Sequence, residues 1–200
     1  MFLIPTCGRP GSVSKLILAC HLYGMPPAAV MVSGDYSAVR WPPHWKIHYG
    51  GQEGMVKATN DLFRLYPNEP WYGFLNDRAR PLEERWFERL LSAVDGGWAN
   101  QYSSKVNPRT GRIRILNGIM DGDLTRRLGW FWPPMFRHLW VDDAMEDLLY
   151  DAGLFHQTDV KIDNELMPKH IRIGNDAAVY AESWYPMKGK FLEELCASSS

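Results

Sequence analysis

The stretch of sequence that decides the fold lies at residues 2–12, which read FLIPTCGRPGS. Phe2 to Thr6 is a short apolar run of the kind found in buried strands, and a turn rich in glycine and proline follows it. Ser12 to Tyr23 then carries apolar residues at helical spacing. A strand, a loop and a helix in this order are typical of the opening of an alternating α/β fold.

The same alternation continues to residue 94. Short apolar runs predict strands, and apolar residues three and four positions apart predict helices. The expected strands are Ala29–Ser33, Lys46–Tyr49 and Trp71–Leu75, and the expected helices are Glu53–Tyr66 and Glu83–Val94. Because strands and helices alternate, the sequence predicts a mainly parallel sheet with helices on both faces.

The second half of the chain is less regular. A turn at Asn107–Gly111 predicts a hairpin that adds mixed strands to the sheet. The expected elements there are strands at Trp98–Tyr102, Arg112–Leu116 and Val160–Ile162 and helices at Asp121–Leu128 and Asp142–Asp151. We therefore expect a single α/β domain over residues 1–186, with a Rossmann-like, mixed and mostly parallel sheet flanked by helices. Residues 187–200 are expected to form a C-terminal tail, which is a candidate flexible segment.

The composition agrees with one folded domain and excludes several other classes. Of the 200 residues, 46% are hydrophobic and 22% are charged, close to the averages of globular proteins, so a disordered chain or a coiled coil is excluded. The formal net charge of -1 provides no global positive field for nucleic acid or an anionic membrane. Three cysteines without close spacing, no signal-like start and no apolar run that could cross a bilayer predict a soluble, cytoplasmic protein.

Polar residues gather where the expected strands end. A loop around Gly8 follows the first strand, Asp35 follows the second, and Asn76-Asp77-Arg78 follows the fourth. The carboxyl ends of parallel strands share one edge of a sheet, which is where such folds bind ligands. A glycine loop there admits a diphosphate, an acid holds a ribose or a base, and a carboxylate ligates a divalent cation. Each signal alone is also typical of an ordinary turn.

Taken in order, four motifs resemble those of the GT-A glycosyltransferases, and most of all those of a small phage-encoded group. The matches are Pro5, Thr6, Gly8, Arg9 and Pro10 for P-S/T-x-G-R-P; Gly54, Ala58 and Asn60 for G-x-x-x-A-x-N; Gly73 to Pro81 for G-F-x-G-D-D-x-R-P; and Pro133, Pro134 and Arg137 to Asp142 for P-P-x-x-R-H-L-Y/W-V-D. The last motif is the most specific. The resemblance extends from residue 1 to about residue 165.

The resemblance implies a GT-A-like fold and a metal-dependent, inverting transfer of a sugar from a nucleotide-sugar donor to a hydroxyl acceptor. A hydroxymethylated base of phage DNA is a candidate acceptor, and a phage-encoded enzyme would act in the host cytoplasm. Asp142 is implied as the catalytic base, and Asp77 with His170 as ligands of Mn²⁺ or Mg²⁺. The residues implied in donor binding are Pro5, Thr6, Gly8, Arg9, Asp35, Asn60, Asn76, Arg137 and His138. The donor sugar and its base, the acceptor and the oligomeric state are not defined by the sequence.

The largest departure from the group lies at the expected metal turn. We interpret Asn76-Asp77 as standing in place of the acidic pair, so that one anionic ligand is missing. An asparagine still offers a carbonyl oxygen to a hard cation, but metal affinity should fall. The histidine-rich segment that follows the last strand in the group has only His170 as a counterpart, with an uncertain alignment.

Several assignments have a structural alternative. Asp142 at the expected start of a helix is equally suited to capping it. His138 is as well suited to a structural hydrogen bond as to a phosphate contact. A basic hairpin is suited to DNA phosphates, although a solvated hairpin is the favoured interpretation. Its basic residues are Lys105, Arg109, Arg112 and Arg114.

Two alternatives to the glycosyltransferase hypothesis stay open. One is a non-catalytic nucleotide-sugar-binding module of the same fold, motivated by Asn76 and by the missing histidine segment. The other is a nucleotidyltransferase, which shares the β/α alternation and metal-assisted phosphate chemistry. The fold alone does not separate these functions.

Overall fold

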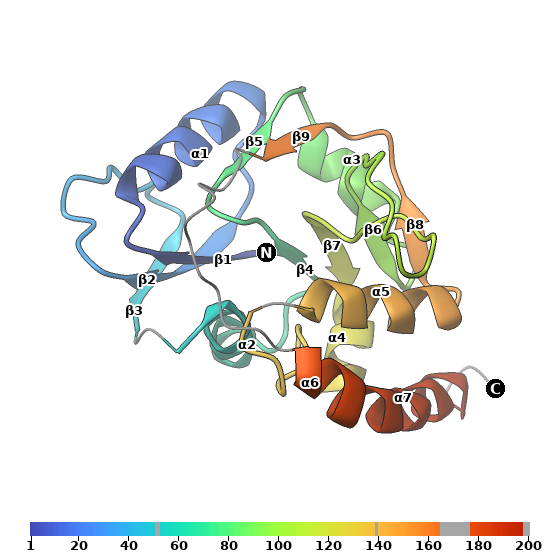
Figure 1. The fold of residues 1–200 in the computed structure, drawn as a ribbon. Helices are drawn as coiled ribbons and strands as arrows, with labels where there is room; N and C mark the ends of the chain where they lie inside the picture. Colours follow the sequence, from blue (N-terminus) through green and yellow to red (C-terminus); the bar gives the residue numbers. More distant parts are fainter. Residues whose placement is uncertain (51–52, 139, 165–176, 198–200) are drawn as a thin grey trace.

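Seven strands form one mixed sheet in the order β3-β2-β1-β4-β7-β6-β8 (Figure 1). The computed structural model describes residues 1–50, 53–138, 140–164 and 177–197. The strands of this sheet are β1 (Phe2–Cys7), β2 (Ala28–Ser33), β3 (Lys46–Tyr49), β4 (Trp71–Phe74), β6 (Trp98–Asn100), β7 (Gly118–Asp121) and β8 (Phe155–Gln157). A second sheet pairs β5 (Ala79–Pro81) with β9 (Ile162–Asn164). The mixed, mostly parallel sheet expected from the sequence is confirmed.

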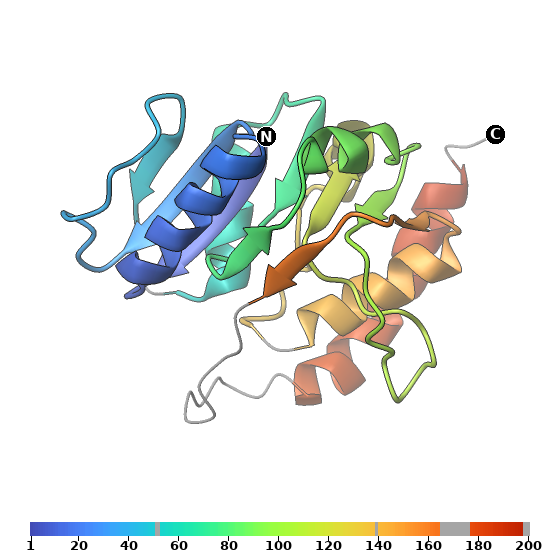
Figure 2. The same cartoon turned by 90° about the horizontal axis from the view of Figure 1, so that it is seen from above.

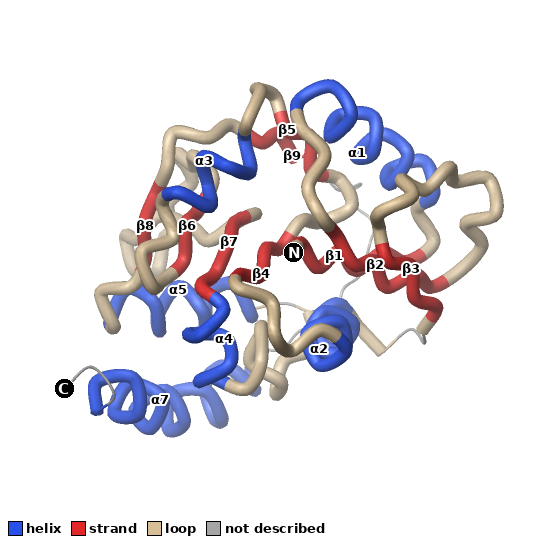
Figure 3. The backbone as a smooth tube through the Cα atoms, turned by 180° about the vertical axis from the view of Figure 1, so that it is seen from behind, coloured by secondary structure: helices blue, strands red, loops and turns tan. Residues whose placement is uncertain are grey.

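Strand β1 lies between β2 and β4 and is parallel to both. Cys7 is opposite Ser33, so β1 and β2 end together, whereas Phe74 at the end of β4 is opposite Leu3. The chain therefore runs on past Phe74 along β1 until Asp77 meets Thr6, which donates a hydrogen bond to it. In the view from behind (Figure 3), β4, β1, β2 and β3 lie next to one another in this order. This register brings the ends of β1, β2 and β4 to one edge.

Helices cover both faces of the large sheet (Figures 1 and 2). The helices are α1 (Pro10–Tyr23) and α3 (Trp86–Ser92) on one face, and α2 (Met55–Leu65), α4 (Gly122–Leu128) and α5 (Val141–Asp151) on the other. Alternate side chains of β1 pack on opposite faces of the sheet. Phe2 and Ile4 are buried in the same cluster as Leu16 of α1, and Leu3 is buried with Leu62 of α2. The alternation of strand side chains thus gives two hydrophobic cores on either side of one sheet.

The sequence predicted a hairpin between residues 98 and 116, and the prediction of its second strand was wrong. Arg112–Leu116 is not a strand of the sheet, and β6 pairs instead with β7, directly after it in sequence. Residues 101–117 form a loop whose two arms are joined by an isolated β-bridge between Val106 and Ile113 and by a backbone hydrogen bond from Gln101 to Asn117. The arginines of this loop pair with acids of α5, so they hold the loop against the helix and away from the sheet.

The C-terminal part of the chain adds a helical layer below α5. Helix α6 (Ala177–Val179), the π-helical turn η1 (Tyr180–Trp184) and helix α7 (Tyr185–Ala197) follow one another. Tyr180, Trp184 and Leu195 are buried in the same cluster as the residues of α5. Helix α7 occupies most of the segment expected as a tail over residues 187–200. None of the helices in the described ranges is long and apolar enough to cross a membrane.

Asn60 joins α2 to the aromatic loop at residues 130–136. Its side chain is 2% exposed, its Oδ1 accepts hydrogen bonds from the backbone N–H groups of Phe131 and Trp132, and its Nδ2 donates to the carbonyl of Trp132. The rings of Phe131 and Trp132 pack into the core below the sheet. One buried amide therefore satisfies three backbone groups of a loop that forms a wall of the site described below.

We expect Asn60→Ala to lower the free energy of unfolding by about 2–4 kcal/mol, because it leaves two buried N–H groups and a carbonyl without partners. Urea denaturation measures this difference. The matched control is Asp61→Ala on the exposed side of the same helix, where ion pairs with Lys57 and Arg64 are lost at a cost of about 1 kcal/mol or less. Equal losses in the two variants would contradict the clamping role of Asn60.

Candidate functional site

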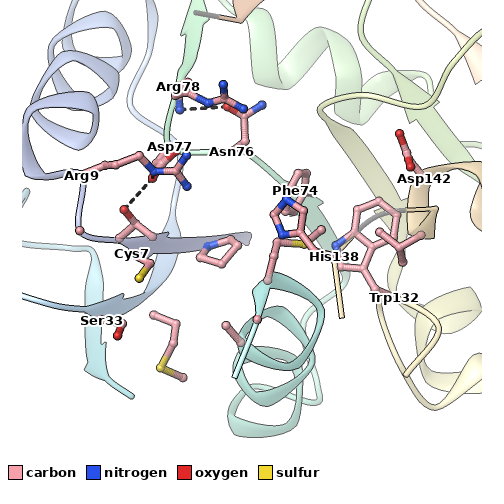
Figure 4. A pocket seen from close by; sticks show the side chains of 18 of the residues that line it. Cys7, Arg9, Ser33, Phe74, Asn76, Asp77, Arg78, Trp132, His138 and Asp142 are labelled. Atoms are coloured by element: carbon pink, nitrogen blue, oxygen red, sulfur yellow. Dashed lines mark hydrogen bonds and ion pairs between the residues drawn. The ribbon is translucent and has the colours of Figure 1, made fainter. Parts of the chain in front are cut away.

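A cavity of about 750 Å³ opens at the edge where β1, β2 and β4 end (Figure 4). One side is lined by residues of the β1 and β4 ends, among them Thr6, Arg9, Asp77 and Arg78. The other side is formed by α2, by the aromatic loop and by the first turn of α5, which contributes Asp142. The cavity therefore lies where open α/β sheets bind their ligands.

Asp77 is a buried carboxylate held by residues of β1 and the loop after it. Only 1% of it is exposed. Its Oδ2 accepts a hydrogen bond of 2.8 Å from Thr6 Oγ1 and lies 2.9 Å from Arg9 Nε. Burial raises the pKa of Asp77, while the charge of Arg9 and the hydrogen bond from Thr6 act in the opposite direction. The carboxylate and Arg9 thus form a partly buried ion pair, which fixes the loop of residues 7–9 to the end of β4.

Asn76 is half-buried and belongs to a network of side-chain amides that includes the buried Asn117 and Gln101. Its Nδ2 donates to Asn117 Oδ1 at 3.1 Å and to Asn164 Oδ1 at 2.6 Å, and its Oδ1 accepts from the backbone N–H of Arg78. Asn117 Nδ2 in turn donates to Asn164 and to Gln101. Because each amide is both donor and acceptor, the network fixes their orientations together. The side chain of Asn76 is therefore engaged within the protein.

Asp142 is the carboxylate of α5 that faces the cavity. The helix begins at Val141 with Trp140 as its N-cap residue, so Asp142 lies within the first turn and does not occupy the capping position. Its Oδ2 lies 3.5 Å from Arg114 Nη1, and 42% of its side chain is exposed. The other acids of α5 point into the loop at residues 101–117. Asn107 donates to Asp143 and Glu146, and Asp147 pairs with arginines of the same loop.

The pKa of Asp142 is raised to about 6. The largest cause is the surrounding protein, which displaces water from the carboxylate, and the negative charge of Asp143 is the next; Arg114 acts in the opposite direction. A carboxylate with a raised pKa is a stronger base when ionised and is suited to accept a proton from a hydroxyl group.

Comparison with known proteins shows likeness of fold. No family model matches the chain, and no curated protein matches its sequence. S. aureus TarS 1–349 in complex with UDP superposes with a TM-score of 0.57 and 11% identity, over 80% of this chain and 57% of that one. Mannosyltransferase PcManGT from Pyrobaculum calidifontis, in complex with GDP-Man and Mn²⁺, has a TM-score of 0.59 and 13% identity, over 99% of this chain and 74% of that one.

These solved structures are GT-A glycosyltransferases. The chain has a GT-A fold. The fold implied by the sequence motifs is thereby confirmed, while the likeness to a phage-encoded group stays a prediction. The chain spans 57% of the TarS fragment, so that protein has a large part without counterpart here. At these identities the likeness concerns the fold alone.

The divalent cation implied for the GT-A site fits the described residues poorly. Among them, no three side chains of His, Cys, Asp or Glu come together as a metal site. Asp77 Oδ2 is engaged by Thr6 and Arg9, and its Oδ1 is enclosed, with no hydrogen-bond partner and less than 1 Å² of accessible surface. Arg9 and Arg78 add positive charge beside this carboxylate. His170, the second expected ligand, lies outside the described residues.

Of the nine residues expected in donor binding, six line the cavity and three do not. Pro5, Thr6, Gly8, Arg9, Asn76 and His138 line the cavity together with Asp77 and Asp142. Asp35 follows β2 at the same edge, but it is exposed and accepts a hydrogen bond from Ser37 within its own turn. Asn60 clamps the aromatic loop. Arg137 is exposed, and its backbone carbonyl accepts a hydrogen bond from Val56 of α2.

Arg78 lines the cavity, and the sequence reasoning placed it at this edge without giving it a role. Counted from Gly73, the second acidic position of G-F-x-G-D-D-x-R-P falls on Arg78, and Asn76 falls on the glycine. The interpretation that Asn76 replaces an acid was therefore wrong. The chain keeps the first acid as Asp77 and has a guanidinium group in place of the second. A position-by-position alignment of the motif would have revealed this reversal of charge.

We expect Asn76→Asp to destabilise the fold by about 1–3 kcal/mol, because a carboxylate cannot donate to Asn117 and Asn164 and would face their oxygens. Thermal and urea unfolding at neutral pH measure the loss. Thr110→Val is the comparison, since it removes the hydrogen bonds that Thr110 Oγ1 donates to the buried Glu146 and accepts from the backbone N–H of Arg112. An Asn76→Asp variant as stable as the original chain would show that the amide network does not depend on Asn76 as a donor.

Proposed function

We propose that this chain is a glycosyltransferase that moves a sugar from a nucleotide-sugar donor to a hydroxyl acceptor with inversion at the anomeric carbon. The GT-A fold supports the general class. The observation that carries the proposal is the arrangement of charge within one cavity. Guanidinium groups line one wall and the carboxylate of Asp142 lines the opposite wall (Figure 4).

This arrangement matches the two demands of glycosyl transfer. The leaving diphosphate gains negative charge, and positively charged groups at the ends of β1 and β4 stabilise it. The acceptor hydroxyl must lose its proton as its oxygen forms the bond to the anomeric carbon, and Asp142 is the base placed to take that proton. The electron pair of the broken bond leaves with the diphosphate. Attack from the face opposite the leaving group inverts the anomeric centre.

The divalent cation expected from the sequence is not part of this proposal. Oδ2 of Asp77 is engaged by Thr6 and Arg9 and its Oδ1 is enclosed, so the described turn offers no open carboxylate oxygen for a metal. The non-catalytic alternative is less favoured, because a module that only binds a donor has no use for a cavity-facing carboxylate with a raised pKa. A nucleotidyltransferase depends on the metal-assisted phosphate chemistry that the described turn supports poorly.

The acceptor is proposed as a hydroxyl compound, and a hydroxymethylated base of phage DNA stays a candidate. The basic loop gives a DNA acceptor little support. Arg112 and Arg114 pair with acids of α5, and Arg109 lies against Asp147 and the ring of Tyr180. Their charges are therefore largely balanced within the protein. Trp132 and Phe74, whose rings meet edge to face in the cavity wall, offer apolar surface for a sugar ring.

The proposal is tested by incubating the protein with UDP-, GDP-, CDP- and ADP-sugars and measuring release of the nucleoside diphosphate. A panel of hydroxyl acceptors, including hydroxymethylated DNA, is added in separate reactions. We expect one donor class to raise the melting temperature and to release its nucleoside diphosphate faster with one acceptor than with water. A chain that binds no nucleotide sugar in any condition would contradict the proposal.

Asp142→Asn should lower kcat by about two to four orders of magnitude, the usual contribution of a general base, while donor affinity stays within about threefold. The matched control is Asp143→Asn, which changes the next residue of the same helix. Asp143 is buried, accepts from Asn107 and does not line the cavity, so this variant should keep most of its activity. Equal loss in both variants would assign the effect to the structure of α5.

The pH profile of transfer gives an independent check. Asp142 accepts a proton only when ionised, and its pKa is raised from 3.8 to about 6, so kcat/KM should fall as the pH is lowered through this region. The charge of Asp143 contributes to this rise, so Asp143→Asn should shift the acidic limb to lower pH. A limb that does not move in Asp143→Asn would argue against Asp142 as the titrating group.

A further inference from the structure

Among the described residues that line the end of the cavity next to β1 and β4, arginines outnumber carboxylates. Arg9 and Arg78 line it there, and Asp77 is the carboxylate between them. Asp142, the other carboxylate among the described lining residues, lies on the opposite wall (Figure 4). The two guanidinium groups beside one carboxylate favour an anion at this end.

Asp77 positions Arg9. The carboxylate is fixed from the other side by Thr6 Oγ1, which also hydrogen-bonds with Tyr36 at 2.6 Å, and the hydroxyl of Tyr36 accepts from the backbone N–H of Arg9. The ion pair uses Nε of Arg9, so the two terminal nitrogens of the guanidinium group are not needed for it. The Arg9 side chain keeps 35% of its surface exposed. A guanidinium group held in this way is suited to a phosphate oxygen.

We propose that Arg9 and Arg78 hold the diphosphate of the donor in place of a divalent cation, so that nucleotide binding by this chain is independent of metal. This inference rests on the proposed function, and it specifies how the same site neutralises the leaving group. A cation at this turn would meet two guanidinium groups and a carboxylate that is already engaged. The diphosphate meets the same groups favourably.

The first experiment is calorimetric titration of UDP, GDP, CDP and ADP into the protein, in EDTA and again in Mn²⁺. For the nucleotide that binds, we expect the two Kd values to agree within about threefold. A Kd that is about tenfold or more lower in Mn²⁺ overturns the inference and leaves the glycosyltransferase proposal in place. If no nucleoside diphosphate binds in either buffer, the proposed function fails, and this inference fails with it.

Asp77→Asn separates the two interpretations by the sign of its effect. Asparagine keeps an oxygen for the hydrogen bond from Thr6, so the fold should persist, and its melting temperature checks this. If Asp77 is the counter-charge of Arg9 and not a metal ligand, removing its negative charge should tighten nucleotide binding in EDTA by about three- to fivefold, because Tyr36 still holds the backbone of Arg9. If Asp77 is a metal ligand, the variant should instead lose affinity in Mn²⁺, which would overturn the inference.

Arg78→Gln tests the second guanidinium group. We expect its nucleotide Kd to rise by about tenfold or more, because a charge-assisted hydrogen bond to phosphate is lost, and the difference should shrink at high salt. The matched control is Arg64→Gln on the surface of α2, whose side chain is 60% exposed and pairs with Asp61. An Arg78→Gln Kd equal to that of the control would overturn the role of Arg78.

Discussion

A buried carboxylate must be compensated, and this constraint organises the site of the chain. Asp77 is 1% exposed at the point where the segment after β4 meets β1. Thr6 and Arg9 supply the compensation, and Tyr36 links them through one hydroxyl group. Removing a single partner from such a group leaves an uncompensated buried charge, which is strongly destabilising. The loop after β1, the start of α1 and the end of β4 are therefore fixed as one unit.

The opposite wall of the cavity depends on a second set of charges. Helix α5 carries Asp143, Glu146 and Asp147 on the side that faces the loop at residues 101–117, and Asn107, Thr110 and the arginines of that loop satisfy them. This leaves Asp142 facing the cavity. The position of the proposed base is thus set by the acids that are engaged elsewhere, because they determine how the helix is rotated against the loop.

The sequence predicted the first half of the fold well, because β1, β2 and β4 are apolar runs and α1 and α2 have a helical repeat. It failed where tertiary contacts decide the structure. Arg112–Leu116 alternates like a strand, but its arginines bind α5. The short strands β5, β8 and β9 have three residues each and leave no periodic signal. The hydrogen bonds among Asn76, Asn117 and Asn164 join segments far apart in the chain, so no local pattern indicates them.

The charge of the cavity depends on which acidic residues of the motif the chain retains and on the charges of the side chains around them. The motif that predicted a metal turn was matched at Asp77, but positive charges beside a carboxylate oppose the binding of a metal cation to it. Here Arg9 occupies one oxygen and Arg78 stands at the next acidic position. The retained acid has therefore become the partner of a cation. A sequence motif shows which side chains are present. What a charged side chain binds depends also on the neighbouring groups that neutralise its charge.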